Sequence, residues 1–433
     1  MSSIWQTSVS LPRFPQLKED IQTDVLIIGG GLTGILCAEH LSRRNIPYLL
    51  VEADRICSGT SGNTTAKITA QHGLIYHKLL RIFGADRAKL YYQANAAALD
   101  RYRALCRNID CDWEEQDNYV YSVDRPQRLD AELDATSRLG IPAVFSESLS
   151  LPFQTAGSVR LPGQAQFHPL KFIRAILPGL NIYEHTPVRS FDGTAYVTGL
   201  AKIRAKKAIV ATHFPIFNKH GSYFIKLYQH RSYVLALDNA PKLNGMYVDE
   251  RSTGLSFRRQ GSLLLMGGGA HRTGGKGGGW TDLGLWAEKY YPEAVVTHRW
   301  AAQDCMPLDY LPYVGRYSSA TSDLFVATGF QKWGMTTAML AASLLCDLVL
   351  EEQNPLEELF SPSRSVIHPR LAKNLVHSMV GLLTPSRPRC PHLGCALKWN
   401  PQEHSWDCPC HGSRFSEKGV LLNDPATGDL NMR

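Results

Sequence analysis

Four cysteines and two histidines near the C-terminal end of this 433-residue chain have the spacing with the clearest chemical meaning. They lie in two short segments, 390–395 (CPHLGC) and 408–413 (CPCHGS). Cys-x-His followed by Cys-x-x-His supplies two thiolates and two imidazoles. That set can hold a structural zinc ion, or a [2Fe–2S] centre in which His replaces Cys on one iron. Because zinc needs neither the second cysteine of each segment nor the Gly-Ser after the last histidine, the pattern favours the iron–sulfur centre.

The two segments resemble the ligand loops of the high-potential Rieske proteins of cytochrome bc complexes, which read C-x-H-L-G-C and C-P-C-H-G-S. The resemblance implies that two cysteines bind one iron and two histidines bind the other. The four implied metal ligands are Cys390, His392, Cys408 and His411. It also implies a disulfide between Cys395 and Cys410 that joins the two loops.

The cluster segment departs from that family in two ways. The resemblance implies that the Ser413 hydroxyl donates a hydrogen bond to a cluster sulfur. Phe415 stands where the family has a second hydrogen-bonding residue, a tyrosine, so we expect a somewhat lower reduction potential of the cluster. The strands that precede the first ligand loop in a complete fold are missing, because 367–383 indicates helix or irregular chain and 385–389 (PSRPR) leads straight into the loop. A strand and proline loop at 419–426 fit the closure over the cluster. We therefore expect a shortened lobe that leans on the larger domain or on a partner.

A second group of residues, near the N-terminal end, indicates a dinucleotide site. Residues 24–28 (DVLII) predict a buried strand, 29–34 (GGGLTG) a tight turn into a helix reaching about Arg44, and 48–51 (YLLV) the next strand. Glycines spaced G-x-G-x-x-G permit the turn, the approach of a pyrophosphate to the backbone, and close helix–strand packing. These glycines are Gly29, Gly31 and Gly34. Glu52 ends the second strand, where it is placed to accept a hydrogen bond from a ribose hydroxyl.

The glycine spacing alone does not separate FAD from NAD, but three later regions do so by resemblance. They are the loop 58–67 (SGTSGNTTAK), the strand and turn 208–213 (AIVATH) with 183–188 (YEHTPV) before it, and 324–336 (LFVATGFQKWGMT) opening a helix. All three resemble the D-amino-acid-oxidase-like superfamily of FAD-dependent oxidoreductases, which includes glycine and sarcosine oxidases. The further FAD contacts that this implies are Ser61, Thr65, Val188, Thr212, Gly329, Gly334, Met335 and Thr336. The N-terminus of the last helix would stabilise negative charge on reduced flavin.

The resemblance extends over nearly the whole chain and is strongest to a bacterial group that joins such a flavin domain to a C-terminal Rieske module. The implied class is α/β: a Rossmann-like FAD-binding domain with an inserted antiparallel β substrate domain of α+β type, plus a small β-rich cluster lobe. The glycine-rich stretch 266–279 lacks nucleotide-binding spacing, and we expect a mobile hairpin there. The expected boundaries are an oxidoreductase domain at 18–360 (cofactor segments 18–80, 156–215 and 300–360; insertions 81–155 and 216–299), a linker at 361–384 and a Rieske domain at 385–433.

Flavin-dependent amine oxidation needs a substrate C–H held over the flavin and usually a cation for a substrate carboxylate. Lys67 and Lys332 are candidates because they lie within motifs that approach the flavin. Arg231 and Arg258, on the expected substrate sheet, are candidates too, although an exposed strand charge is the commoner role of such arginines. The candidate bases, each of which more often has a structural role, are His72, His213 and His271.

Composition narrows the class of protein further. The net charge of +7 comes from 46 basic and 39 acidic residues without a long run of one sign, which argues against nucleic acid as a partner. No stretch approaches the roughly 18 apolar residues of a membrane-spanning helix, and the first residues lack a signal-peptide pattern. We therefore expect a cytoplasmic protein without a transmembrane anchor.

Together these residues predict an FAD-dependent enzyme that oxidises a small amine or amino-acid-like substrate. Electrons would pass from the flavin to a Rieske [2Fe–2S] cluster and on to an unknown acceptor, a protein or a quinone. A dehydrogenase is more natural than an oxidase, because oxygen needs no iron–sulfur relay. The alternative is an electron-transfer module that relays electrons between protein partners without a small-molecule substrate. A Rieske oxygenase is not favoured, since the sequence offers no convincing 2-His-1-carboxylate site.

Overall fold

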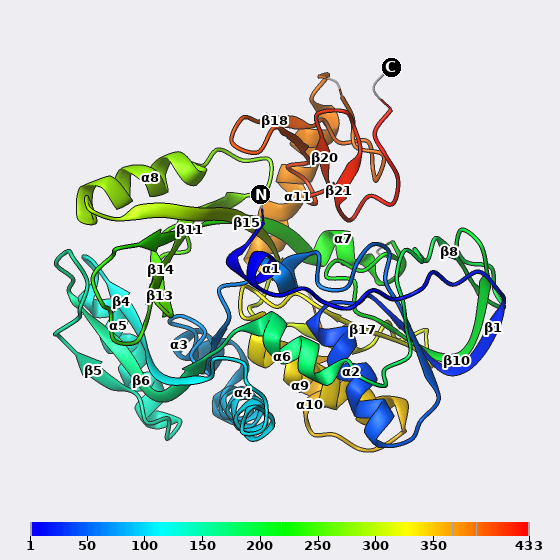
Figure 1. Ribbon diagram of the computed structural model, residues 1–433, viewed down its shortest axis with the longest axis horizontal. Coiled ribbons are helices and arrows are strands. Elements are labelled where there is room, and N and C mark those ends of the chain that lie inside the picture. Colours follow the sequence, from blue (N-terminus) through cyan, green and yellow to red (C-terminus); the bar gives the residue numbers. More distant parts are fainter. Residues whose placement is uncertain (1, 218, 366–367, 387, 432–433) are drawn as a thin grey trace.

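Three β-sheets organise the chain in a computed structural model, which describes residues 2–217, 219–365, 368–386 and 388–431. The first sheet carries the N-terminal glycine turn, the second lies beside it, and the third belongs to a C-terminal lobe that sits on the other two (Figure 1). Mixed helices and strands in this arrangement confirm the predicted α/β class. Within the described ranges, no helix is both long and apolar enough to cross a bilayer.

The first sheet has the order β16-β17-β10-β1-β2-β7, with β1 parallel to both β2 and β10. The run predicted as a buried strand is buried from Val25 to Ile28, as expected for a central parallel strand covered on both faces. The strands are β1 (Ile21–Ile28), β2 (Tyr48–Val51), β7 (Ile182–Tyr183), β8 (Ser190–Phe191), β9 (Tyr196–Val197), β10 (Lys202–Val210), β16 (Tyr313–Arg316) and β17 (Leu324–Thr328). The glycine turn thus joins two central strands through one helix.

Helices pack against both the first and the second sheet. Two of them, α2 (Leu32–Arg43) and α9 (Gly334–Val349), begin at the glycine turn and at the last FAD-like motif, where the sequence predicts helices. The others are α1 (Ile4–Ser8), α3 (Tyr76–Phe83), α4 (Ala85–Cys106), α5 (Pro126–Arg138), α6 (Pro169–Ile176), α7 (Tyr223–Lys226), α8 (Gly279–Tyr290), α10 (Leu356–Phe360) and α11 (Pro369–Leu383). Two 3-10 turns span Thr60–Asn63 and His220–Ser222.

The second sheet has the order β15-β11-β14-β13-β12-β4-β6-β3, and β5 pairs with β6. It is antiparallel apart from the parallel pair of β12 and β4, and it includes β6 and β15 from segments expected for the cofactor domain. Its strands are β3 (Lys67–Ile68), β4 (Glu114–Ser122), β5 (Val144–Ser146), β6 (Gly157–Gln166), β11 (Leu227–Asp238), β12 (Met246–Asp249), β13 (Ser256–Gln260), β14 (Leu263–Arg272) and β15 (Val295–Pro307).

One prediction needs correction, because the glycine-rich stretch 266–279, expected to be a mobile hairpin, is in part an ordered strand. Its first half belongs to β14, paired with β11 and β13. A Cβ atom on Gly267 would lie 2.7 Å from Ser256 Oγ, and one on Gly268 would lie 2.7 Å from Leu255. These glycines therefore allow close packing within the sheet rather than mobility.

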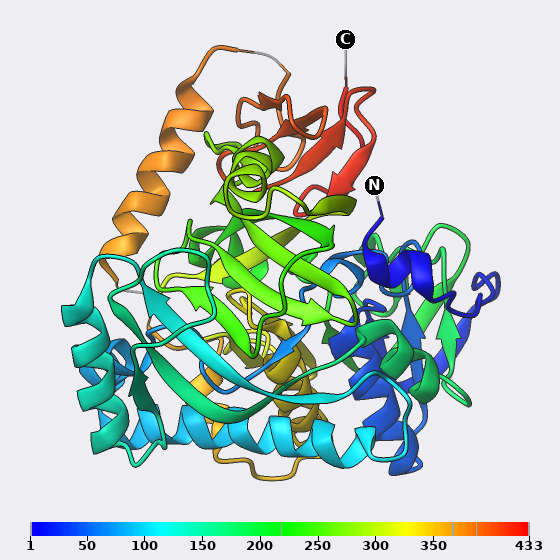
Figure 2. The ribbon, with the colours of Figure 1, turned by 60° about the vertical axis from the view of Figure 1, so that its left-hand side comes forward.

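The third sheet, β18-β19-β20-β21, forms the core of the C-terminal lobe. Its strands are β18 (Lys398–Asn400), β19 (Ser405–Asp407), β20 (Arg414–Ser416) and β21 (Leu421–Asn423). In the described part of the lobe every named strand follows the first ligand loop, in agreement with the expected loss of the early strands. The segment expected to be helical or irregular is α11, which runs along the outside of the molecule toward the lobe (Figure 2); Ile367 lies outside the described residues.

Candidate cofactor sites and the cavity between them

The glycine turn after β1 has the close backbone contacts that a dinucleotide site requires. Gly29 has a φ of +114°, and a Cβ atom there would lie 2.6 Å from Ala211 O. A Cβ atom on Gly34 would overlap Gly29 O, so helix α2 can cross β1 closely only with glycine at this position. Gly31 is the N-cap of α2, and Gly31, Leu32 and Thr33 line the neighbouring cavity, so the start of this helix faces the space where a pyrophosphate would bind.

Two polar side chains predicted to bind the cofactor hold the shape of this turn. Glu52 accepts hydrogen bonds from the N–H of Gly30 at 2.7 Å and of Asp54 at 3.0 Å. Burial raises the pKa of Glu52, although these N–H groups oppose the shift. Ser61 Oγ accepts from the N–H of Leu32 at 2.9 Å, which places the predicted flavin loop against the start of α2.

A cavity of about 1370 Å³ extends from the glycine turn to the second sheet. This volume exceeds the range of about 300–1,000 Å³ typical of ligand pockets. The predicted FAD contacts that line the cavity are Gly29, Gly31, Glu52, Ser61, Thr65, Val188, Thr212, Gly329, Gly334 and Met335. Gly34 lies beneath the turn, and Thr336 donates to Thr69 O at 3.1 Å instead of facing the cavity.

Lys67 is a buried amine on the cavity wall. Its exposed fraction is 8%, and burial, followed by the nearby charge of Arg258, lowers its pKa to about 7. Within the described residues no hydrogen bond or ion pair of its Nζ is found. The side chain can therefore exchange a proton near neutral pH.

Lys332 and Asp304 form a second polar group on the same wall. Burial lowers the pKa of Lys332, an effect that the carboxyl group of Asp304 partly opposes. Burial raises the pKa of Asp304 to about 6, while Lys332 and Arg231 act in the other direction. Lys332 Nζ donates to Ser252 O at 3.4 Å, and no ion pair of Lys332 with a carboxylate is found among the described residues.

Neither of the two arginines considered for a substrate carboxylate is free of protein partners. Arg231 lines the cavity, but its guanidinium makes a bidentate ion pair with Glu403 from the C-terminal lobe. Arg258 donates to the carbonyl groups of Thr65 at 2.9 Å and Ala66 at 3.0 Å, which fixes the flavin loop. Both arginines therefore hold segments together.

The candidate bases differ in their surroundings. His72 contacts Tyr91 Oη, Thr69 O and Thr336 Oγ1, and burial lowers its pKa to about 3. Burial lowers the pKa of His213 to about 4, and it also lowers the pKa of His271, which stacks on Tyr233. His72 and His213 line the cavity as neutral rings, and the contacts of His72 are typical of a structural residue.

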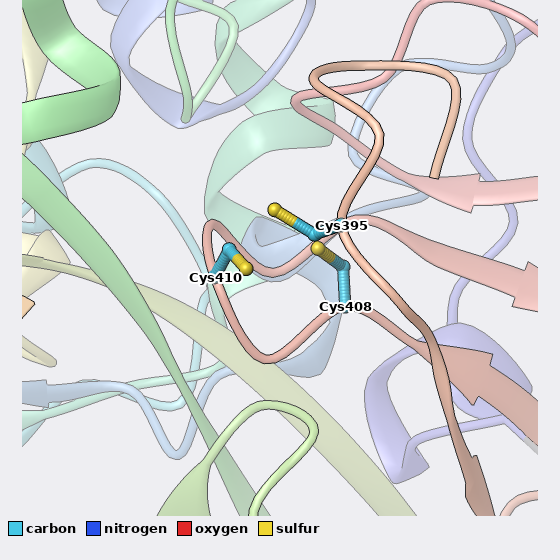
Figure 3. Close-up of side chains that lie close together, drawn as sticks. All are labelled: Cys395, Cys408 and Cys410. Atoms are coloured by element: carbon cyan, nitrogen blue, oxygen red, sulfur yellow. The ribbon is translucent and has the colours of Figure 1, made fainter. Parts of the chain in front are cut away.

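The two ligand loops meet at a group of buried sulfur atoms. The Sγ atoms of Cys395, Cys408 and Cys410 all lie within 4.8 Å of one another (Figure 3). Cys395 and Cys410, between which the resemblance implies a disulfide, are free thiols in the structure. The short distance between these sulfur atoms shows that the two loops lie side by side.

Of the four implied ligands only Cys408 belongs to this sulfur group, and the other three lie in the same two loops. Cys390 is 2% exposed, and the rings of His392 and His411 lie with their centroids 5.0 Å apart. Burial lowers the pKa of His392 to about 3 and of His411 to about 4, so both rings are neutral and able to coordinate metal. His411 Nδ1 is buried without a hydrogen-bond partner among the described residues, as a metal-binding nitrogen would be. The donor set fits a Rieske cluster.

Ser413 is positioned to support that cluster. Its Oγ accepts from the N–H of Ala426 at 3.0 Å, which leaves the hydroxyl hydrogen available to donate. The thiol of Cys390 lies within hydrogen-bonding reach of this hydroxyl. Phe415, which replaces the tyrosine of the resembling family, is fully buried in the same apolar core as Cys390 and Cys408.

The second ligand loop docks directly on the second sheet. Gln303 Nε2 donates to Gly412 O at 2.9 Å, and the Arg272 guanidinium donates to Cys410 O at 2.9 Å. A Cβ atom on Gly274 would lie 2.6 Å from Pro409 N, so the two backbones touch. The lobe lacks the early strands, and these contacts with the larger domain support it instead.

The C-terminal lobe also closes one side of the cavity, which the sequence did not indicate. The cavity lining includes 421–424, Ala426 and Thr427, in the strand and loop predicted only to cover the cluster. Gln229 Nε2 donates to Asp424 O at 3.0 Å, and burial raises the pKa of Asp424 to about 7. The flavin-side cavity and the cluster lobe therefore share a wall.

Comparisons with protein-family models agree with this division of the chain. Residues 24–348 match the family described as FAD dependent oxidoreductase, and residues 376–432 match the Rieske [2Fe-2S] domain. The first match begins within β1, before the glycine turn, and runs through almost all of α9. The second begins within α11 and includes every implied metal ligand.

Individual relatives show the same pattern. The chain is 36% identical to the Rieske 2Fe-2S iron-sulfur protein YhfW of Bacillus subtilis (strain 168), over 98% of this chain and 96% of the relative. It is 44% identical over 43 residues to the cytochrome b6-f complex iron-sulfur subunit 2 of Trichormus variabilis, covering 10% of this chain and 24% of that subunit. The crystal structure of glycine oxidase from Geobacillus kaustophilus aligns with a TM-score of 0.66 at 21% identity, covering 79% of this chain and 99% of that one. At 21% identity, the similarity to glycine oxidase shows a shared fold alone.

Proposed function

The chain belongs to the FAD dependent oxidoreductase family and carries a C-terminal Rieske [2Fe-2S] domain. We propose that it oxidises a small amine or amino-acid-like substrate and passes the electrons to its own cluster. Bound FAD supplies a two-electron acceptor, and the Rieske cluster supplies a one-electron carrier for delivery to a separate acceptor. The final acceptor is a protein or a quinone.

One observation carries this proposal: a single cavity is lined by the glycine turn, by the second sheet and by the cluster lobe. Its volume leaves room for a small molecule beside the dinucleotide. Its wall of residues 421–424 places the lobe next to the compartment where substrate would react. These features favour an enzyme that passes electrons to a cluster in the same chain. A module that only relays electrons between proteins would need no cavity for a substrate.

Lys67 would act as the base in this cavity. An amine substrate arrives as an ammonium ion and must lose a proton before its C–H bond can be oxidised. With its pKa lowered to about 7, Lys67 is partly neutral at neutral pH and can accept that proton. Its position on β3, beside the flavin loop, supports this assignment.

Lys332 would orient the substrate through its positive charge. It follows Gly329 on the approach to α9 and lines the cavity without a close carboxylate partner among the described residues. A substrate carboxylate would supply that partner, a role that Arg231 leaves open because Glu403 already binds it. Arg231 instead connects the substrate compartment to the cluster lobe.

Anaerobic titration of the FAD-loaded protein with a panel of small amines and amino acids tests the proposal. At least one such compound should bleach the flavin absorbance, whereas alcohols and carboxylates of the same size should not. If no amine reduces the flavin while a reduced protein donor does, the relay module replaces the enzyme as the better account.

A further inference from the structure

Helix α11 turns its polar and small side chains toward the protein. Asn374 is 2% exposed and accepts a hydrogen bond from the Arg272 guanidinium at 2.6 Å. Gly381 lies so close to the cluster loops that a Cβ atom would overlap Cys410 Sγ. Ser378, half-buried, lies on the same side. A helix on the surface of a water-soluble protein normally has the opposite arrangement, with its apolar side inward.

The outward side of α11 is apolar. Residues at i, i+3, i+4 and i+7 share one face of a helix, and from Val376 this spacing selects Met379, Val380 and Leu383. Their exposed fractions are 58% for Val376, 58% for Met379, 60% for Val380 and 77% for Leu383. Leu375 and Leu382 widen the exposed stripe. Figure 2 shows α11 along the outside of the molecule, and a continuous exposed apolar stripe of this kind marks an interaction surface.

The chain around α11 is basic and free of acidic residues. From residue 361 to residue 402 the sequence has six Lys or Arg residues and neither Asp nor Glu. Arg364 is paired with Asp309, but Arg389 and Lys398 are exposed, and in the described part of the chain no carboxylate pairs with them. Arg389 donates to Thr384 O at 2.7 Å, so its charge lies at the C-terminal end of the helix.

We propose that α11 is a membrane-surface helix that lies in the headgroup region of an anionic phospholipid bilayer. The apolar stripe would enter the edge of the acyl region, while the surrounding cations contact lipid phosphates. A length of 15 residues, about 22 Å, suits a helix lying in the surface rather than crossing it. The absence of acidic residues over 361–402 favours an anionic lipid surface over a second copy of this chain, whose matching face would be equally basic.

This attachment would also bring the Rieske lobe to the membrane. Gly381 O accepts from the N–H of Ala396 at 2.9 Å, so the C-terminal end of the helix is bonded directly to the chain that follows the first ligand loop. The inference does not depend on the identity of the substrate, because it concerns a surface outside the cavity.

Vesicle co-sedimentation of the full-length protein, loaded with both cofactors, tests this inference. We expect binding to phosphatidylglycerol vesicles that is about tenfold stronger than to phosphatidylcholine vesicles, and that weakens as salt is added. The variants Val380→Glu and Met379→Glu, made separately, should each reduce the bound fraction several-fold because a charge would have to enter the apolar layer. Flavin content and the cluster signal of both variants should be unchanged, which shows that they are folded.

The matched control is Leu285→Glu on α8, a residue with a similar exposed fraction of 61% on another helix. It should bind vesicles like the unmodified protein. The inference is overturned if neither lipid is bound, if Leu285→Glu lowers binding as much as Val380→Glu, or if light scattering shows a dimer that Val380→Glu dissociates.

Discussion

At the scale of single residues, the proposed chemistry depends most on Lys67. Its amine is buried beside Arg258, and both effects lower its pKa to about 7. Both the ammonium and the neutral form are therefore populated near physiological pH. Below that pH the ammonium form cannot accept the substrate proton, and above it the neutral amine can. The rate of flavin reduction should therefore rise with pH, by about tenfold per unit below pH 7, and level off above it.

Lys67→Met should remove this pH transition and slow flavin reduction by about 10²–10⁴-fold, the usual contribution of a general base. The exposed Lys242→Met is the matched control and should keep both the rate and the profile. Stopped-flow absorbance with a reactive amine, recorded across the pH range, measures both. A profile unchanged in Lys67→Met would assign the base to another group, and Asp304 would be the first to test.

Phe415 sets a second expectation at this scale. It is fully buried in the core that contains Cys390 and Cys408, where a tyrosine would place a hydroxyl donor. Phe415→Tyr should raise the reduction potential of the cluster, since one added hydrogen bond of about 1 kcal/mol corresponds to roughly 40 mV for a single electron. A redox titration followed by electron paramagnetic resonance measures the shift, with Phe415→Leu as the control that adds no donor. Equal potentials in all three proteins would contradict this role.

At the scale of elements, the turn between β1 and α2 decides whether FAD binds. Gly34→Ala would force its methyl group onto Gly29 O and displace α2 from β1. We expect at least a tenfold loss of FAD affinity, about 1.4 kcal/mol. Gly199→Ala, in the turn before β10 and outside the cavity lining, is the control, because a Cβ atom there meets nothing within 4 Å. Flavin-to-protein ratios of the purified variants test this; equal ratios would mean that the turn is not the cofactor cradle.

The elements that could be predicted from the sequence are those whose signal is local. The strand–turn–helix of β1 and α2, the helix α9 and the two ligand loops each combine a motif with a short apolar run, so their type and position follow from neighbours in the chain. The glycines of β14 misled the prediction, because the close packing of Gly267 on Ser256 depends on a partner strand. Composition alone cannot distinguish a packed glycine from a mobile one.

The contacts that could not be predicted join distant segments. Glu403 binds Arg231 across 172 positions, and Asp424 reaches Gln229 across 195. The sequence offered Arg231 as a substrate ligand because amine oxidation usually needs a cation for a substrate carboxylate. The ion pair of Arg231 with Glu403 is visible only in the folded chain. The cytoplasmic location and the domain boundaries remain predictions.

At the scale of the whole molecule, a buried charge network holds the cluster lobe on the catalytic domain. Burial acts to raise the pKa of Glu403, but the bidentate contact of Arg231 and the charge of Arg414 together lower it to about 2. Glu403→Gln would leave Arg231 and Arg414 close together without their shared carboxylate. Removal of one partner from such a buried pair costs about 3–5 kcal/mol.

The thermal midpoint of Glu403→Gln should therefore fall by several degrees, and electron transfer from flavin to cluster should slow as the lobe loosens. Glu358→Gln is the matched control, because the pair of Glu358 with Arg87 is exposed and contributes less than about 1 kcal/mol. Calorimetry and single-turnover kinetics compare the two variants. A loss in Glu403→Gln no larger than in Glu358→Gln would mean that the network does not hold the lobe.

The central claim is that substrate electrons leave the flavin through the cluster of the same chain. The most direct measurement is electron paramagnetic resonance of anaerobic protein frozen after mixing with a reactive amine, with iron and sulfide counted on the same sample. We predict two irons and two sulfides per chain and the rhombic signal of a reduced His-ligated centre, appearing as the flavin absorbance falls. Flavin bleached by substrate beside a cluster that stays oxidised, or a site that holds zinc, would contradict the account.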